Sequence, residues 1–273
     1  MVSPRKWIES EDGMGGSIGS EGVGKGMSKG KFGYGLRFCL LSILVMFFSS
    51  CSSGKKETGL KFATSADYPP FEYQEKGQLC GFDIELARMV AAELGREAEF
   101  HDMSFGNILL ALENGRVDGA VSAIAVTPER EKVVDFSQRY YYDELALVTP
   151  RRHPLTSLEE LEGKIVACQL GTTMEIWLKA HVPQATILSM DHNLQAIEAL
   201  RSGRANGVLV DLAQGRALNR QYPELVFCAL AQSDEGYAMA FRKGSPLTDQ
   251  VNHALEVLKR SGKIARLKAK YQL

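Results

Sequence analysis

An internal repeat is the feature that most restricts the fold of this chain. The segment ALENGRVDGAVS, residues 111–122, matches ALRSGRANGVLV, residues 199–210, with Ala, Leu, Gly, Arg and Gly recurring in register. Each copy is expected to run from a helix end, through a glycine turn, into a strand. A true repeat predicts two similar α/β lobes; the alternative is a chance similarity between two common helix-turn-strand units.

Strands and helices are expected to alternate from Leu60 onward. Apolar runs bounded by turn residues predict strands at residues 60–65, 119–124, 164–169 and 207–210. Periodic segments with start and stop signals predict helices at 83–94, 105–112 and 194–200, one opened by Thr127-Pro128, and a capping box at 157–160. This order is typical of βαβ units with parallel sheets, an α/β fold class.

The repeat also predicts where a ligand binds. Ligands of open α/β sheets bind beyond the carboxyl ends of parallel strands. Residues 122–126 and Asp211 directly follow the two repeated strands. Two lobes that face each other would bring both segments into one cleft.

The N-terminal region has the features of an export signal. Residues 38–48, FCLLSILVMFF, follow Lys29, Lys31 and Arg37 and are too short to span a membrane. Ser49-Ser50-Cys51 resembles a lipobox, in which Cys51 is lipidated, although Phe48 stands where leucine is usual. We therefore expect a lipoprotein signal peptide at 27–51 and a polar tether at 52–59; a plain cleaved signal and a buried helix are the alternatives.

The residues before Met27 are expected not to fold. Eight of the 26 glycines lie within residues 1–30, with few large apolar side chains. Because the basic residues of a signal peptide stand near its start, we expect Met27 to be the true start and residues 1–26 to be an annotation artefact. A genuine N-terminal extension is the alternative.

Composition excludes several classes of function. The 32 basic and 33 acidic residues nearly balance, and no dense Lys/Arg stripe suits a nucleic-acid groove. The region after residue 51 retains Cys80, Cys168 and Cys228, which lack the short spacings of a zinc site. We expect buried thiols, with a disulfide between two of them as the alternative, and neither a metal nor a cofactor.

Five motifs together resemble a known family. They are SADYPPFE at 65–72, GFDIEL at 81–86, TPER at 127–130, VDFS at 134–137 and LGTT at 170–173. Their order and spacing are similar to those of the family 3 periplasmic solute-binding proteins, the amino-acid receptors of ABC importers, over residues 60–273. Within that family the chain looks most like arginine-binding proteins of the ArtJ type.

The resemblance implies a site for the α-carboxylate and α-ammonium groups of an amino acid. Arg130 offers a planar fork for a carboxylate, and Thr172 and Thr173 offer hydroxyls and N–H groups at a helix start. The family pattern pairs Asp211 with the ammonium; its alternative role is a helix N-cap. Ser122 and the backbone of Ala123 and Ala125 are expected to complete the contacts to the ammonium and carboxylate groups. Ala123 and Ala125 stand where serines are common in relatives, so they can offer only backbone groups.

The resemblance also implies a subsite for the ligand's side chain. Tyr68 and Phe105 match positions where the family stacks aromatic rings, and rings around a guanidinium contribute about 0.5 to 2 kcal/mol. Glu72 or Asp67 is expected to neutralise a basic side chain. The remaining candidates are two polar residues and one apolar residue: Ser65, Gln169 and Met174.

The fold implied is the type II periplasmic binding protein fold, two similar α/β lobes joined by a two-strand hinge. Lobe 1 is expected to contain residues 60–143 and 237–273, and lobe 2 residues 144–236. The crossings are expected near 143–149 and 235–240, with closure of the lobes over the ligand.

The function predicted is an extracytoplasmic receptor that captures a basic L-amino acid, arginine first, and delivers it to an ABC permease. The expected protein is a monomer in the periplasm or cell envelope, held to the membrane by its lipid. One alternative is a periplasmic enzyme on the same fold, such as a dehydratase, although all five histidines lie outside the cleft motifs. The other is a surface or sensory lipoprotein that binds amino acids.

Overall fold

The computed structural model describes residues 59–233 and 235–273. The predicted signal peptide, Cys51 and residues 52–58 of the tether lie outside the described residues. None of the helices in the described ranges is long and apolar enough to cross a membrane.

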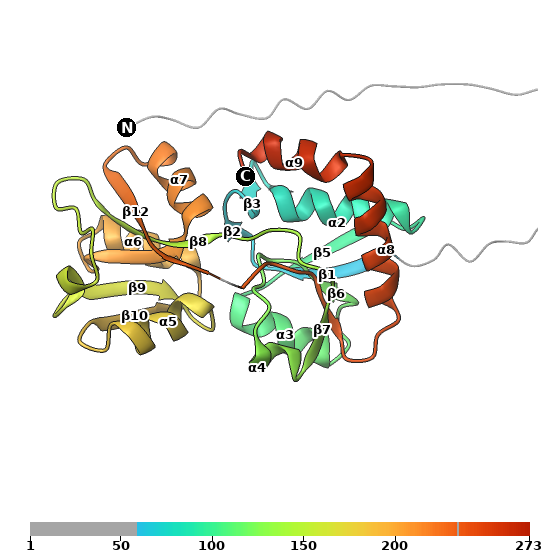
Figure 1. Cartoon of the computed structure of the whole chain (residues 1–273), viewed down its shortest axis with the longest axis horizontal. Coiled ribbons are helices and arrows are strands. Elements are labelled where there is room, and N and C mark those ends of the chain that lie inside the picture. Colours follow the sequence, from blue (N-terminus) through green and yellow to red (C-terminus); the bar gives the residue numbers. More distant parts are fainter. Residues whose placement is uncertain (1–58, 234) are drawn as a thin grey trace, which may run out of the picture. The chain divides into compact units, whose positions relative to one another are not determined.

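The first of two five-stranded sheets has the order β5-β1-β6-β13-β7 (Figure 1). β1 pairs in parallel with both β5 and β6, whereas β13 runs antiparallel to β6 and β7. The strands are β1 (Leu60–Thr64), β5 (Ala98–Asp102), β6 (Gly119–Ala120), β7 (Val134–Phe136) and β13 (Ala240–Arg242).

Helices cover both faces of this sheet. Phe62 of β1 packs with residues of α2, α8 and α9, while the next residue, Ala63, packs with α3 on the opposite face. Apart from the exposed Lys61, the residues of β1 are buried, as expected for a strand with helices on both faces. The helices are α2 (Phe82–Glu93), α3 (Phe105–Glu113), α4 (Pro128–Glu131), α8 (Leu247–Arg260) and α9 (Lys263–Tyr271).

The second sheet has the order β10-β9-β11-β8-β12, with β9 parallel to β10 and β11, and β8 antiparallel to β11 and β12. α5 packs on one face, and α6 and α7 pack on the other. The strands are β8 (Glu144–Pro150), β9 (Ile165–Gln169), β10 (Thr186–Met190), β11 (Gly207–Asp211) and β12 (Leu225–Gln232). The helices are η1 (Glu159–Leu161), α5 (Thr173–His181), α6 (Asn193–Arg201) and α7 (Leu212–Gln221).

A small antiparallel sheet carries three of the predicted site residues: Asp67, Tyr68 and Glu72. It has the order β2-β3-β4, with β2 (Asp67–Tyr68), β3 (Glu72–Glu75) and β4 (Gln78–Cys80). Gly81 then joins β4 to α2 with φ +124°, and a Cβ there would lie 2.1 Å from the Phe71 carbonyl oxygen. Only glycine fits such an approach, so the start of α2 is held against the Phe71–Glu72 backbone.

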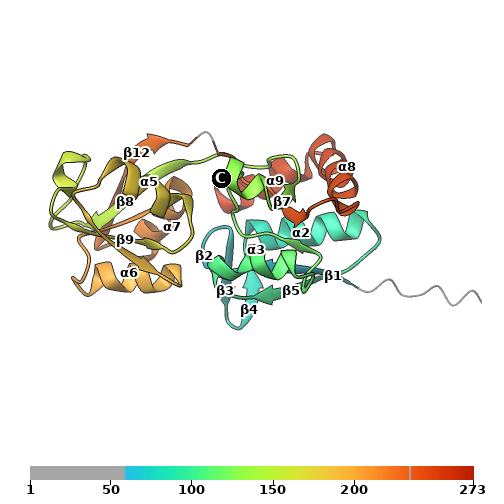
Figure 2. The ribbon, with the colours of Figure 1, turned by 90° about the horizontal axis from the view of Figure 1, so that it is seen from below.

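Two segments connect the large sheets (Figure 2). One runs between β7 and β8, residues 137–143, and the other between β12 and β13, residues 233–239. Tyr237 forms antiparallel bridges with Ala125 and with Tyr141. The expected crossing at 143–149 was placed too late, because β8 is already paired within the second sheet from Glu144.

The two copies of the repeat fold into the same turn. Gly115 and Gly203 have φ +66° and +77°, and their N–H groups donate to the carbonyls of Leu112 and Leu200, at 3.0 Å in both. The following arginine N–H groups donate to the carbonyls of Ala111 and Ala199, at 3.0 and 2.8 Å. The repeat is therefore a structural repeat, since equivalent atoms make equivalent bonds.

Most predicted elements are present, and one was too long. β6 ends at Ala120 rather than residue 124, because the chain leaves the sheet and Ala123 takes φ +43°. Thr127 caps α4 as predicted, accepting the Arg130 N–H at 3.2 Å. Only one half of the predicted capping box forms: the Glu160 carboxylate accepts the Ser157 N–H at 3.1 Å, whereas the short helix η1 has Leu158 at its N-cap and no side-chain cap bond. The three cysteines of the described region are free thiols.

Candidate functional site

A cavity lies where the ends of the two repeated strands meet, with about 430 Å³ of empty space including its mouth. All predicted ligand contacts except Ser65 and Asp67 line it. The complete lining is Tyr68, Glu72, Phe105, Ser122, Ala123, Ala125, Arg130, Gln169, Thr172, Thr173, Met174, Asn193, Leu209, Asp211 and Tyr237.

Arg130 is the one cationic side chain in this lining. Its guanidinium donates to the Ala125 carbonyl at 2.8 Å and to the Gly171 carbonyl at 3.1 Å, and it stacks 5.3 Å from the centre of the Phe105 ring. Burial lowers the pKa of Arg130 to about 10, so it stays charged at neutral pH. These two bonds orient the fork and leave further N–H groups of its five for a ligand.

The start of α5 forms the adjacent wall. The Thr172 hydroxyl donates to the Gln169 carbonyl at 2.6 Å and accepts the Glu175 N–H at 3.4 Å, while the Glu175 carboxylate accepts the Gly171 N–H at 2.8 Å. Thr172 is thus an N-cap. The first N–H groups of the helix have no intrahelical partner, and the positive end of the helix dipole favours an anion there.

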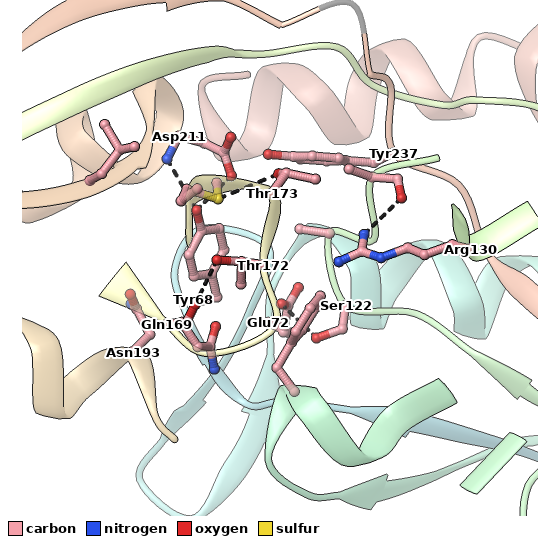
Figure 3. A pocket seen from close by; sticks show the side chains of 15 residues that line it. Tyr68, Glu72, Ser122, Arg130, Gln169, Thr172, Thr173, Asn193, Asp211 and Tyr237 are labelled. Carbon is pink, nitrogen blue, oxygen red and sulfur yellow. Dashed lines mark hydrogen bonds between the residues drawn. The ribbon is translucent and has the colours of Figure 1, made fainter. Parts of the chain in front are cut away.

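Asp211 ends β11 on a different side of the cavity from Arg130 (Figure 3). Its carboxylate accepts a 2.5 Å hydrogen bond from the Tyr68 hydroxyl, and its own N–H donates back to that oxygen at 3.1 Å. Asp211 also occupies the N-cap position of α7, as its alternative role predicted, but its side chain makes no cap bond there. Burial, then the charge of Asp143, raises the pKa of Asp211 to about 7.

Glu72 and Ser122 lie together on a third side (Figure 3). The Ser122 hydroxyl donates to Glu72 Oε1 at 2.9 Å and accepts the Ser65 N–H at 3.0 Å. Ser65 is therefore buried behind Ser122, with its own hydroxyl 3.4 Å from Gln169 Nε2. Burial and the nearby charge of Asp83 raise the pKa of Glu72 well above its usual value.

The backbone of residues 123–125 is already hydrogen-bonded. The Ala123 N–H donates to Asp83 Oδ2 at 2.7 Å, and the Ala125 carbonyl accepts from Arg130. These alanines line the cavity, but these two polar groups serve the protein itself.

Asp67 lies outside the cavity lining, in a neighbouring groove. Its Oδ2 accepts the Leu194 N–H at 3.2 Å and lies 3.9 Å from His192 Nδ1, and its carbonyl accepts from the Asn193 amide at 3.2 Å. The side chain thus ties the β2 loop to the start of α6. Of the two acids expected to meet a basic side chain, the structure brings only Glu72 to the cavity.

Three lining residues escaped the sequence analysis: Asn193, Leu209 and Tyr237. Leu209 belongs to the second repeat and Tyr237 to an expected crossing, so both segments had been identified while their side chains had not. Asn193 carries no local signal. In the ranges that the structure describes, no cluster of His, Cys, Asp or Glu is arranged to hold a metal ion.

Known proteins are similar to this chain in sequence and in architecture. The family model of bacterial extracellular solute-binding proteins, family 3, matches residues 60–273. The arginine-binding extracellular protein ArtP of Bacillus subtilis (strain 168) is 36% identical over 228 residues, covering 82% of this chain and 89% of ArtP.

Two solved structures are similar at the level of the fold. An ancestral arginine-binding protein bound to arginine has a TM-score of 0.76 and 34% identity, covering 79% of this chain and 99% of that one. The ancestral amino-acid-binding protein AncCDT-1, a precursor of cyclohexadienyl dehydratase, has a TM-score of 0.75 and 34% identity, covering 79% and 96%. The chain belongs to the bacterial extracellular solute-binding proteins of family 3.

Proposed function

We propose that this protein is an extracytoplasmic receptor that captures a free basic L-amino acid, arginine first, and delivers it to an ABC importer. One observation carries the proposal: a single cavity holds the cationic Arg130 on one side and the buried acids Asp211 and Glu72 on two others. Arginine presents one carboxylate and two cations, and each needs an opposite charge once it leaves water.

Each ligand group has a partner in this proposal. The α-carboxylate binds the Arg130 fork and the N–H groups at the start of α5, where Thr172 and Thr173 lie. The α-ammonium binds Asp211. The guanidinium extends toward Glu72, with Tyr68 as the aromatic neighbour, since Phe105 is already stacked on Arg130. The relatives named as arginine-binding support this ligand.

We propose that lobe 1 contains residues 60–143 and 237–273, and lobe 2 residues 144–236. Closure would turn on the two connecting segments, and the bonds between Tyr68 and Asp211 and between Arg130 and Gly171 would hold the closed form. We further propose cleavage of the leader before Cys51, lipid attachment there, and a monomer that meets its permease at the membrane.

Calorimetry on the purified protein with a panel of amino acids tests the receptor. We expect one-to-one binding with arginine as the tightest ligand, and native mass spectrometry of untreated protein should show co-purified ligand of the same mass. Bound ligand is first removed by unfolding and refolding the protein. If no amino acid of the panel then gives a heat of binding at high protein concentration, the receptor function is refuted.

An enzyme is the second candidate, because Glu72 and Asp211 are cavity acids whose pKa values are raised, as those of general acids are. The similarity to a dehydratase precursor supports it. Receptor and enzyme separate in one assay: a receptor returns its ligand unchanged after long incubation, whereas a dehydratase converts a small carboxylate substrate and releases water.

A further inference from the structure

Asp83 is a buried acid beneath the cavity that the proposed function does not use. It is the second residue of α2 and is 0% exposed, and it does not line the cavity. The close approach at Gly81 holds it against the start of β3, because the Asp83 N–H donates at 2.9 Å to the carbonyl of Phe71, the residue before β3. Its neighbour across this contact is Glu72, which is 1% exposed and does line the cavity.

The hydrogen bonds of the two carboxyl groups leave one oxygen on each without a donor. Asp83 Oδ2 accepts the Ala123 N–H and the Tyr140 hydroxyl, both at 2.7 Å, and Glu72 Oε1 accepts the Ser122 hydroxyl. Asp83 Oδ1 and Glu72 Oε2 are buried and have no donor among the described residues. Hydrogen bonding with the Glu72 side chain also acts on the pKa of Asp83, and two carboxyl groups can share such a bond only when one of them carries a proton.

The residues around Glu72 and Asp83 disfavour a negative charge on both carboxyl groups at once. Besides each other, the acids that act on Glu72 are Asp67 from β2 and Asp211 from β11. The phenols of Tyr68 and Tyr140 are neutral, and Arg130, the cation of the cavity lining, is bound to the carbonyls of Ala125 and Gly171. Burial raises the pKa of Asp83 to about 7 even though two donors favour its charged form, and the pKa of Glu72 is raised well above normal.

We propose that Glu72 and Asp83 are a buried acid pair that holds one shared proton in the empty receptor, and that a cationic ligand side chain expels this proton while an uncharged one does not. The two donors on Asp83 keep the charge there, so the proton resides on Glu72. On binding, the Glu72 O–H bond breaks, the carboxylate faces the guanidinium, and the proton passes to solvent. The inference rests on the proposed function, since it needs a cation at Glu72.

Proton release makes affinity depend on pH in a way that identifies the ligand's charge. Over the range in which the empty pair is protonated and the bound pair is not, arginine affinity rises with pH by up to about tenfold per pH unit. This range lies above the usual pKa of a glutamate carboxyl, because burial and the charge of Asp83 raise the pKa of Glu72. Citrulline has the shape of arginine with a neutral urea group, so its affinity should lack this rise.

Asp211 also binds a proton near neutral pH, but its contribution to proton release is the same for arginine and citrulline and cancels when the two are compared. Both ligands bring the same ammonium to Asp211, so both expel the same proton from it. The difference in proton release between arginine and citrulline therefore reports on the Glu72 and Asp83 pair alone.

The experiment is calorimetry of both ligands near neutral pH in two buffers of different ionisation enthalpy, which counts the protons released. We expect arginine to release up to about one proton more than citrulline in the wild type. The difference should vanish in Glu72→Gln and persist in the matched variant Asp67→Asn, which removes an acid outside the cavity. Equal counts for the two ligands in the wild type would overturn the inference and leave the receptor intact.

An infrared measurement on the empty protein does not depend on binding. Asp211 is a second buried acid, so the band of the pair is the part of the carboxylic acid carbonyl stretch that Glu72→Gln removes. This part should be present in the wild type at neutral pH, disappear as pH is raised, and be lost on adding arginine but not citrulline. If the empty wild type has no band that depends on Glu72, the pair is overturned. If neither ligand binds but this band is present, the shared proton stands and the receptor function fails.

Discussion

The two copies of the repeat fold alike and then diverge at the point where they meet the cavity. After the turn at Gly115, β6 contributes only Gly119–Ala120 to its sheet before the chain bends at Ala123 into a loop that carries Ser122 and Ala125. After the turn at Gly203, β11 continues to Asp211, because residues 208–211 pair with β8. The end of β6 thus supplies a loop to the cavity, whereas the end of β11 supplies the acid Asp211.

The divergence shows that a repeated scaffold need not give a repeated site. In lobe 1 the loop places Ser122 on Glu72 and leads to Arg130. In lobe 2 the longer strand aims Asp211 at Tyr68 across the cavity. An asymmetric ligand such as an amino acid needs different partners at its two ends, and two equal strand ends would not provide them.

The largest expected effect contrasts an arginine beyond the lobe 1 loop with one in the lobe 2 turn. Arg130→Ala removes a charge-assisted partner worth about 1.5 to 3 kcal/mol and leaves a carboxylate unpaired, so arginine affinity should fall by two orders of magnitude or more. Arg204→Ala should change affinity little, because Arg204 is exposed and its side chain bonds only Ser202 among described residues. Calorimetry measures both, and equal losses would show that the carboxylate site lies elsewhere.

The next effect concerns the two acids of the β2–β3 hairpin. Glu72→Gln keeps size and removes charge, so arginine should weaken by about 1 to 3 kcal/mol while glutamine weakens little or gains. Asp67→Asn should cost less, because Asp67 lies outside the cavity and holds the start of α6. Ligand titrations of both variants check this. Loss of binding in Asp67→Asn alone would make Asp67 the neutralising acid, and no effect from either would rule out recognition by charge.

The third effect is the pH dependence of stability in the empty protein. A carboxyl whose pKa rises from 3.8 to about 7 on folding binds more protons in the folded state, so it stabilises the fold at low pH. That stability is lost as pH rises from about 4 to about 7, by up to about 1.4 kcal/mol per pH unit for one group. Denaturant titrations across this range should show a shallower loss in Asp211→Asn.

Asp83 and Glu72 in lobe 1 should retain their share of the pH dependence in that variant. A slope in Asp211→Asn equal to that of the wild type would mean that Asp211 is ionised in the empty cavity. A complete loss of slope would mean that the lobe 1 acids do not contribute.

The smallest effect tests the equivalence of the two turns. Gly115→Ala and Gly203→Ala each force a side chain into the left-handed region, at a cost of about 1 to 2 kcal/mol in unfolding free energy. A Cβ at Gly203 meets nothing within 4 Å, whereas one at Gly115 lies 3.1 Å from Arg242 Nη1, so Gly115→Ala should cost slightly more. Denaturant unfolding measures both. A loss in only one variant would show that the turns are not equivalent.

Local signals in the sequence determined much of this protein. The repeat predicted two turns whose bonds are equivalent, Thr127-Pro128 predicted the start of α4, and LKFATS predicted a strand. The reason is that turns, caps and apolar periodicity act over a few residues, so the sequence alone carries them. The family motifs also identified most of the cavity lining.

Only the tertiary structure decided how the acids are used. Asp211 could cap α7 by its local sequence, but Tyr68, 143 residues away, takes its carboxylate. Asp67 and Glu72 lie on one hairpin, yet Asp67 bonds the start of α6 and lies outside the cavity lining. The close approach at Gly81 places Asp83 next to the same hairpin, beside Glu72. Burial, which sets the protonation of these groups, depends on what packs around them from distant segments, and no local pattern encodes that.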